Sequence, residues 1–295
     1  MADGEQAQFE SRKSALTEGV STRGQGKVRM WVSAIDAQDE DERPWRTESD
    51  DIIKIYRSAH EQEKQQAFNI LYSNTETLLP AVYNSTPVPD IRRRYNDPGP
   101  AAKAAADILE RAISFTVDQY DFDGAIRSAI FDGMTVGRGL VRLRYEPEVI
   151  DDQVNPQITV EYVPWKNFRR GPGLVWTDVS WIAFKHYLTR EELVKLSPET
   201  GKVIGLDYDT RTGGKTEDNT GARDESDTFL RACVWEIWDK ATKTVLFIAP
   251  NWKDGPLREE DDPLKVTGFY PIPRPIQPID TPCDLIPVPP YRAYT

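Results

Sequence analysis

Residues with catalytic chemistry are scarce in this sequence. It holds two histidines, His60 and His186, and two widely spaced cysteines, Cys233 and Cys283. His60 falls in a polar helical stretch and His186 at the end of a strand-like stretch, so neither favours a Ser-His-Asp or Cys-His pairing. No P-loop, dinucleotide-binding GxGxxG or zincin HExxH motif occurs. The two cysteines fit a reducing compartment rather than a disulfide framework or a zinc site. The sequence therefore predicts no catalytic residue, no cofactor and no metal site.

Residues 136–139, Val-Gly-Arg-Gly, are the nearest approach to a phosphate-binding loop. They follow a helical pattern and precede a strand pattern, which reverses the strand-to-helix order that such loops need. Glycine permits positive φ. The segment therefore predicts a tight reversal of the chain.

Two compact clusters of cations remain as candidates for contacts with other molecules. They are Arg92, Arg93 and Arg94 in the first cluster and Lys166, Arg169 and Arg170 in the second. Guanidinium and ammonium groups bind phosphates and carboxylates, so the clusters predict phosphate contacts or a salt-bridged interface. For either cluster taken alone, ordinary solvated surface is the competing interpretation.

Large aromatic residues gather in the second half of the chain, where strand alternation places most of them in a core. They are Trp165, Phe168, Trp176, Trp181, Trp235 and Trp238. Tryptophan also dominates protein–protein contacts, so an interface role stays open for some of them.

Helical periodicity dominates the first half of the chain. Residues 1–27 are polar and predict a mobile arm, and a short helical pattern begins at Lys27. The acidic run over residues 36–45 predicts a solvated loop. Residues 48–85 carry apolar side chains at helical spacing and predict one or two helices, which Pro80 should kink or break.

The strongest helical pattern covers residues 101–137. Its alanines favour helix intrinsically, and Ile108, Leu109 and Ile113 belong to a broad apolar stripe. A break near residues 121–124 should divide it into two helices.

Period-two alternation replaces the helical pattern after Gly139. Residues 141–145 and 158–162 predict half-buried strands, and residues 179–184 predict a strand with two apolar faces. Residues 189–192 form a capping box before a short helix. Residues 205–227 predict a disordered loop.

The last third of the chain combines a hairpin with a proline-rich stretch. Residues 229–239 and 244–250 flank a short turn and predict a β-hairpin. Residues 263–290 are crowded with proline and must run extended. The expected fold is α+β, with a helical N-terminal half, a β-rich second half and a proline-rich extended tail.

Four segments follow from these patterns. They are an arm with a short helix at 1–44, a helical region at 45–138, a β-rich region at 139–255 and an extended segment at 256–295.

The chain is acidic, with a net charge of -11 over 295 residues. It repels nucleic acid as a whole, so any DNA contact must be local or weak. No stretch approaches the roughly 18 apolar residues that span a bilayer, and the N-terminus lacks the apolar core of a secretory signal. These features predict a soluble intracellular protein with no membrane partner.

Five phrases in the same order resemble the portal proteins of tailed bacteriophages, in their podovirus-like branch. The first two are residues 69–80 followed by Tyr83 and Pro87, and residues 132–145. The third joins residues 163–168, 171–172, Trp176 and 179–193, and the last two are residues 234–240 and residues 268–275 with 287–294. Gly137, Arg138 and Gly139 stand where that family steps from helix to strand. With gaps, the resemblance runs from about Trp45 to the end.

The resemblance implies a non-enzymatic, portal-like subunit of a ring, expected to be a dodecamer, at the unique capsid vertex of the virion. Double-stranded DNA would enter and leave through that ring, which is assembled in the host cytoplasm. The implied partners are other copies of the chain, the terminase large subunit, head-completion and tail adaptor proteins, and the capsid and scaffolding proteins. Portal subunits are longer than this chain, so the resemblance also implies an N-terminal portion.

Two other classes of protein remain as alternatives. A head–tail connector or adaptor would form a ring only on a preformed partner. A metal-dependent hydrolase of carbohydrate or nucleic acid would use carboxylates such as Asp151-Asp152 or Asp261-Asp262. Nothing in the sequence fixes two carboxylates at a working separation, so the hydrolase is the weaker alternative.

Overall fold

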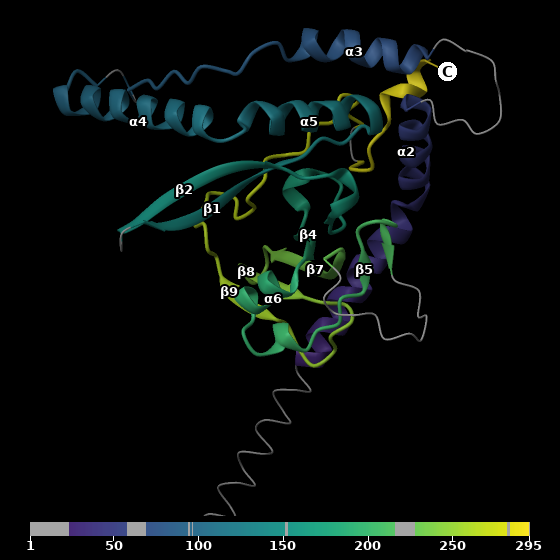
Figure 1. Ribbon diagram of the computed structural model, residues 1–295. Coiled ribbons are helices and arrows are strands. Elements are labelled where there is room, and N and C mark those ends of the chain that lie inside the picture. The colour runs from purple at the N-terminus through teal and green to yellow at the C-terminus, as the bar shows by residue number, and fades with distance from the viewer. Residues whose placement is uncertain are drawn as a thin grey trace, which may run out of the picture. The chain divides into compact units, whose positions relative to one another are not determined.

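The computed structural model describes residues 24–57, 69–93, 95, 97–150, 153–215, 228–281 and 284–294 (Figure 1). Several expectations fall outside these residues: those for the first 23 residues, for most of residues 205–227, and for His60, Arg94, Asp151, Asp152 and Cys283. The fold is α+β with antiparallel sheets, so that part of the prediction is confirmed.

The chain divides into two compact units, each built from separate stretches. The first unit contains residues up to Asp41, Asn167–Gly173 and Thr177–Phe269. The second unit contains Glu42–Lys166, Leu174–Trp176 and the chain from Tyr270 onward.

The first unit is an antiparallel sheet of long and short strands, with a hydrophobic core on each face. Its strands are β3 (Phe168–Arg170), β4 (Trp181–Leu188), β5 (Tyr208–Asp209), β6 (Gly214–Lys215), β7 (Leu230–Asp239), β8 (Thr244–Ile248) and β9 (Arg258–Asp261). The order is β3-β4-β7-β5-β6, and β8 pairs with β7 and β9. The predicted hairpin is confirmed as β7 and β8, with Asp239 opposite Thr244.

Alternation along β7 supplies both cores of this unit. Trp235 and Ile237 point to the face where a helix over residues 24–41 packs through Val28 and Trp31. Ala232 and Val234 lie in the opposite core with Leu193 of α6 (Arg190–Leu196). The predicted capping box is confirmed, because the side chain of Thr189 accepts from the backbone of Glu192 and the Glu192 carboxylate accepts in return.

The aromatic set is buried as predicted, with one exception. Trp165, Phe168, Trp181, Trp235 and Trp238 are all buried. Trp176 is only partly buried, and its ring lies 6.0 Å from that of Tyr270.

The second unit is built on four helices and a two-stranded ribbon. The helices are α2 (Arg43–Tyr56), α3 (Ile70–Val82), α4 (Pro100–Gln119) and α5 (Phe122–Val136), and the ribbon pairs β1 (Val141–Ile150) with β2 (Gln153–Tyr162). The predicted break between α4 and α5 is confirmed: Tyr120 is extended, and the carboxylate of Asp121 accepts from the Gly124 amide at 3.1 Å. Pro80 was expected to kink or break the helix; it lies inside α3, which continues to Val82, so the helix is not broken there.

The reversal predicted at residues 136–139 is confirmed and depends on both glycines. Gly137 ends α5 in the left-handed region at φ 86°. Gly139 exchanges two backbone hydrogen bonds with Ile276, of 2.9 and 2.8 Å. A Cβ on Gly139 would lie 1.9 Å from the carbonyl oxygen of Ala129, so only glycine fits this close approach.

The expectation of a solvated loop over residues 36–45 is wrong. Residues 36–41 continue the preceding helix, Glu42 is a turn residue, and α2 begins at Arg43. Charge repulsion does not unwind the run because two of its carboxylates have cationic partners: Asp39 pairs with Arg169, and Glu42 with Arg138. Pro44 stands in the first turn of α2, where its missing N–H costs nothing.

A second correction concerns residues 205–227, which were expected to form a disordered loop. Residues 208–215 instead form the β5–β6 hairpin, and β5 also pairs with β7. Asp209 is buried and is neutralised by Arg211 at 2.9 Å, which explains how so polar a segment joins the sheet.

The proline-rich stretch behaves as predicted over its described part. Residues 263–281 and 284–289 contain neither helix nor strand, apart from the single bridge at Ile276. A 3-10 helix, η5 (Pro290–Tyr294), follows. In the parts of the chain that the structure describes, no helix is long and apolar enough to cross a membrane.

Candidate interaction sites in the second unit

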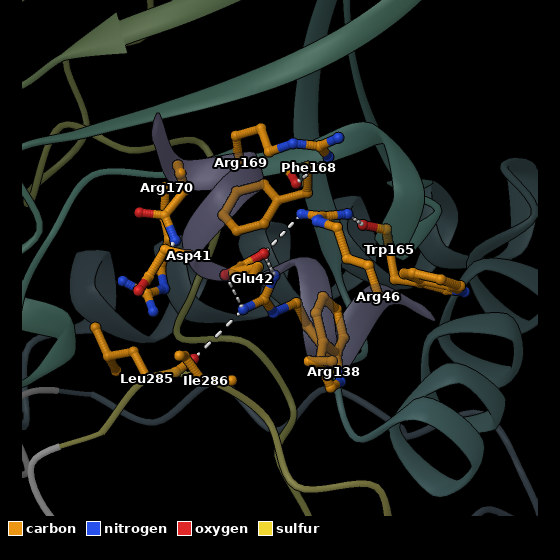
Figure 2. A network of polar contacts seen from close by, with 12 residues as sticks. Asp41, Glu42, Arg46, Arg138, Trp165, Phe168, Arg169, Arg170, Leu285 and Ile286 are labelled. Carbon is orange, nitrogen blue, oxygen red and sulfur yellow. Dashed lines mark hydrogen bonds and ion pairs between the residues drawn. The ribbon is translucent and has the colours of Figure 1, made fainter. Parts of the chain in front are cut away.

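A buried ion network ties the start of α2 to the end of α5 (Figure 2). Arg138 donates to both carboxylate oxygens of Glu42, at 2.6 and 2.9 Å, and to the carbonyl of Leu285 at 3.3 Å. Arg46 donates to the same carboxylate at 2.6 Å. The Glu42 side chain is wholly buried and that of Arg138 is 1% exposed. Forked bonds of this kind satisfy charges that burial would otherwise penalise.

Two tryptophans complete this junction. The Trp45 indole donates to the carbonyl of Val136 at 2.8 Å, and its ring lies edge-to-face with Trp165 at 5.4 Å. The guanidinium of Arg138 lies 4.4 Å from the centre of the Trp45 ring, within range of a cation–π contact. These contacts are internal to the unit, so the network positions elements and leaves no group free for a substrate.

The first predicted cation cluster is exposed and locally paired. Arg92 forms an ion pair with Asp90 at 2.7 Å, and Arg93 donates to the carbonyl of Asp97 at 2.6 Å. Both guanidinium groups point into the connection between α3 and α4.

The second predicted cluster is split by its surroundings. Arg169 and Arg170 are buried; Arg169 pairs with Asp39, and Arg170 donates to the carbonyl of Gly171 at 3.1 Å. Lys166 is exposed, pairs with Asp50 and lies 5.2 Å from the Trp165 ring centre. Of these three cations, only Lys166 presents its charge to solvent.

A pocket of about 520 Å³ adjoins this lysine, and a buried carboxylate forms part of its wall. Asp132 is 4% exposed and accepts from the Tyr162 hydroxyl at 2.5 Å and from the Trp165 amide at 3.4 Å. Burial raises the pKa of Asp132 to about 6, against the two hydrogen bonds, which lower it. Burial beside this carboxylate also raises the pKa of Tyr162.

Two apolar surfaces of the unit are left uncovered. In α4 the stripe is exposed by 65% at Ile108, 54% at Leu109 and 65% at Phe115, and Ala106 is the helix's buried residue. The extended segment before α4 runs back along this helix and contacts it, with the Ile91 amide donating to Glu110 at 3.2 Å (Figure 1). Contiguous exposed apolar side chains mark interaction sites.

The ribbon carries the second uncovered surface. Its strands were predicted correctly, but Leu143, Tyr145 and Ile158 are exposed, whereas Arg142 is buried and pairs with Glu161 at 2.8 Å. These three side chains of the ribbon are therefore left uncovered, although Tyr162 on the same face donates to Asp132 of α5.

Metal ligands and histidine are the groups of the described residues that bear on catalytic chemistry. No group of three or more His, Cys, Asp or Glu side chains there could hold a metal ion. His186 pairs with Glu236 at 2.7 Å, and the other oxygen of that carboxylate accepts from the Trp238 indole.

One comparison with known proteins decides the family. The family model of the phage P22-like portal protein matches residues 88–277, well over half of the chain. The chain belongs to this family of portal proteins. No curated protein matches it. The resemblance predicted from the five phrases is thus confirmed.

Portal proteins are structural components of tailed-phage virions. The matched residues include α4, α5, the ribbon and the sheet of the first unit.

Sequence reasoning missed the buried Glu42–Arg138 pair and the buried carboxylate of Asp132 in this portal-family chain. Arg138 was noted only as part of a Gly-Arg-Gly phrase, and its partner Glu42 lies 96 residues earlier in a run taken for a loop. Asp132 carried no signal either, because its partner Tyr162 was assigned to a strand for its apolar alternation.

Proposed function

We propose that this chain is the subunit of a portal ring, expected to be a dodecamer, at the unique capsid vertex. Double-stranded DNA would pass through that ring during packaging and ejection. The observation that carries the proposal is the family match, together with apolar surfaces that the subunit leaves uncovered.

A closed ring needs a heterologous interface, in which two different faces of each copy meet. The α4 stripe and the apolar face of the β1–β2 ribbon are two such faces. Covering one Ile, Leu or Phe side chain contributes about 1.5–3 kcal/mol. A few such side chains from each copy are therefore enough to favour assembly.

The acidic charge suits a conduit. A net charge of -11 opposes release of counterions from DNA, so the duplex is not held by the ring and is able to slide. In this proposal the chain has no catalytic role, and ATP hydrolysis belongs to the terminase large subunit that docks during packaging. Head-completion and tail adaptor proteins replace the terminase afterwards, and the capsid and scaffolding proteins surround the ring.

Native mass spectrometry and negative-stain images of the purified chain test the proposal. We expect rings of about a dozen copies with a central hole, formed without any partner protein. A connector or adaptor would form rings only on a preformed portal. Monomers from the full-length gene at high concentration would overturn the proposal.

Variants of α4 locate the interface. The double variant Ile108→Asp/Leu109→Asp should lose rings but keep its circular dichroism spectrum. Lys103→Asp is the matched control, because 100° per residue places Lys103 on the opposite side of the helix from this stripe. Loss of rings in the control alone would contradict the assignment of the stripe.

A further inference from the structure

The pocket beside Lys166 combines cations, aromatic rings and a buried carboxylate in one concave site. It has a volume of about 520 Å³ and lies wholly within the second unit, between α2, α3, α5 and the end of β2. A volume of this size takes one or two side chains of a peptide and not a duplex. Neither the α4 stripe nor the exposed apolar residues of the ribbon contribute to its wall.

Two arginines of the pocket are available for an anionic ligand. Arg57, at the end of α2, and Arg127, in α5, are both exposed. Within the described ranges, the side chain of neither arginine has a hydrogen bond or an ion pair with another residue. A third cation, Lys166, stands at the same pocket. Guanidinium groups in this state bind carboxylates in forked, charge-assisted hydrogen bonds.

Its rings form an aromatic wall. Tyr56 and Phe131 meet edge-to-face at 5.0 Å, and Trp165 lines the same pocket. The faces and edges of such rings pack favourably against another aromatic side chain.

The carboxylate of Asp132 favours a hydrogen-bond donor, and not an anion, in the part of the ligand that enters the pocket. Both hydrogen bonds from the described chain, those of Tyr162 and Trp165, go to its Oδ2 atom, so Oδ1 is left to accept another donor. A peptide amide or an indole N–H supplies that donor. A phosphodiester carries no such donor, and the charge of any ionised phosphate would oppose that of Asp132.

We propose that this pocket binds an acidic, aromatic peptide segment of a partner protein. An aromatic side chain packs on Tyr56, Phe131 and Trp165 and donates to Asp132, while flanking carboxylates pair with Arg57 and Arg127. This binding is separate from ring assembly, because it uses none of the surfaces assigned to the ring.

Fluorescence anisotropy with the purified chain tests the pocket. The probe is a fluorescein-labelled peptide, acetyl-Glu-Trp-Glu-Phe-Glu-amide, and the matched probe carries Gln for every Glu. We expect the Gln peptide to bind at least about tenfold more weakly, since each lost charged hydrogen bond is worth that much. The double variant Arg57→Gln/Arg127→Gln should bind the acidic peptide at least about tenfold more weakly than the wild type, with an unchanged melting temperature.

Arg29→Gln is the matched control. Arg29 is an exposed arginine of the helix over residues 24–41 and does not line the pocket, so this variant should bind like the wild type. Three results would overturn the proposal: equal binding of the two peptides, equal binding by the double variant, or displacement of the peptide by inorganic phosphate or duplex DNA at lower concentration. A double variant that forms smaller oligomers would assign the pocket to a second copy of the chain and would also overturn it.

Discussion

Glu42 shows how an acidic chain keeps a charge inside its fold. Its carboxylate is wholly buried, yet Arg138 and Arg46 both donate to it, so its lone pairs are used and its charge is balanced. Removing one partner from such a group leaves an uncompensated charge in a medium that solvates it poorly. The network therefore matters for stability mainly because the loss of one partner is costly. The attraction between its charges contributes less.

Arg138→Met tests that penalty. It should destabilise the chain by about 3–5 kcal/mol, because the buried Glu42 carboxylate would lose its forked ion pair. Urea unfolding measures the change. Arg92→Met is the matched control: the Arg92 pair with Asp90 is exposed, and its loss should leave the stability nearly unchanged. Equal effects of the two variants would contradict the role given to the network.

Asp132 predicts a pH dependence of stability. Burial raises its pKa in the folded chain from 3.8 to about 6. At pH values between these two, Asp132 is ionised in the unfolded chain but still protonated in the folded chain. Wild-type stability therefore falls as pH rises through this window. The variant Asp132→Asn has no proton to lose and can still accept from Tyr162. Its stability relative to wild type should therefore rise by about 3 kcal/mol from about pH 4 to about pH 7.

Thermal unfolding of both proteins across that pH range measures the difference. A difference that stays constant with pH would show that Asp132 titrates normally in the folded state. A difference that falls with rising pH would reverse the sign expected from burial.

At the scale of elements, the sequence predicted those whose signal is local. Period-two alternation located β1 and β7, and a capping box located the start of α6. The errors came where distant partners decide. Residues 36–41 are helical although the acidic run suggested a loop, because Arg138 and Arg169 neutralise it from far along the chain. The pocket beside Lys166 could not be predicted, because its walls meet only after α2, α3 and α5 have packed.

The step from α5 to β1 gives a prediction at the same scale. Gly139→Ala should destabilise the chain by at least about 2 kcal/mol, because the new Cβ would lie 1.9 Å from a backbone oxygen that cannot move aside. Gly26→Ala is the matched control: its Cβ would meet nothing within 4 Å, and alanine in a helix gains about 0.5 kcal/mol over glycine. Chemical unfolding of both variants compares them. A mild effect at Gly139 would mean that α5 and β1 can separate at little cost.

The proposed function places two opposed requirements on the whole molecule. A ring needs adhesive contacts between its copies, and a DNA conduit needs a surface that does not adhere to DNA. The chain separates them by chemistry: apolar side chains are left exposed on α4 and on the ribbon, while the overall charge is -11. Apolar contacts are insensitive to salt, whereas contacts with phosphates weaken steeply as salt rises.

This separation predicts opposite responses to salt. Rings should persist at about 1 M NaCl, because their contacts are apolar and screening at this ionic strength acts within about 3 Å. The dissociation constant of the purified chain for duplex DNA should exceed about 0.1 mM at physiological salt. This affinity is weaker than the usual range for non-specific DNA-binding proteins. Mass photometry and anisotropy with labelled duplex measure the two quantities on the same sample. Micromolar DNA binding with a steep salt slope would mean that local cations outweigh the net charge, and the chain would then grip the DNA rather than let it slide. Rings that dissociate at high salt would assign the interface to ion pairs instead of the α4 stripe.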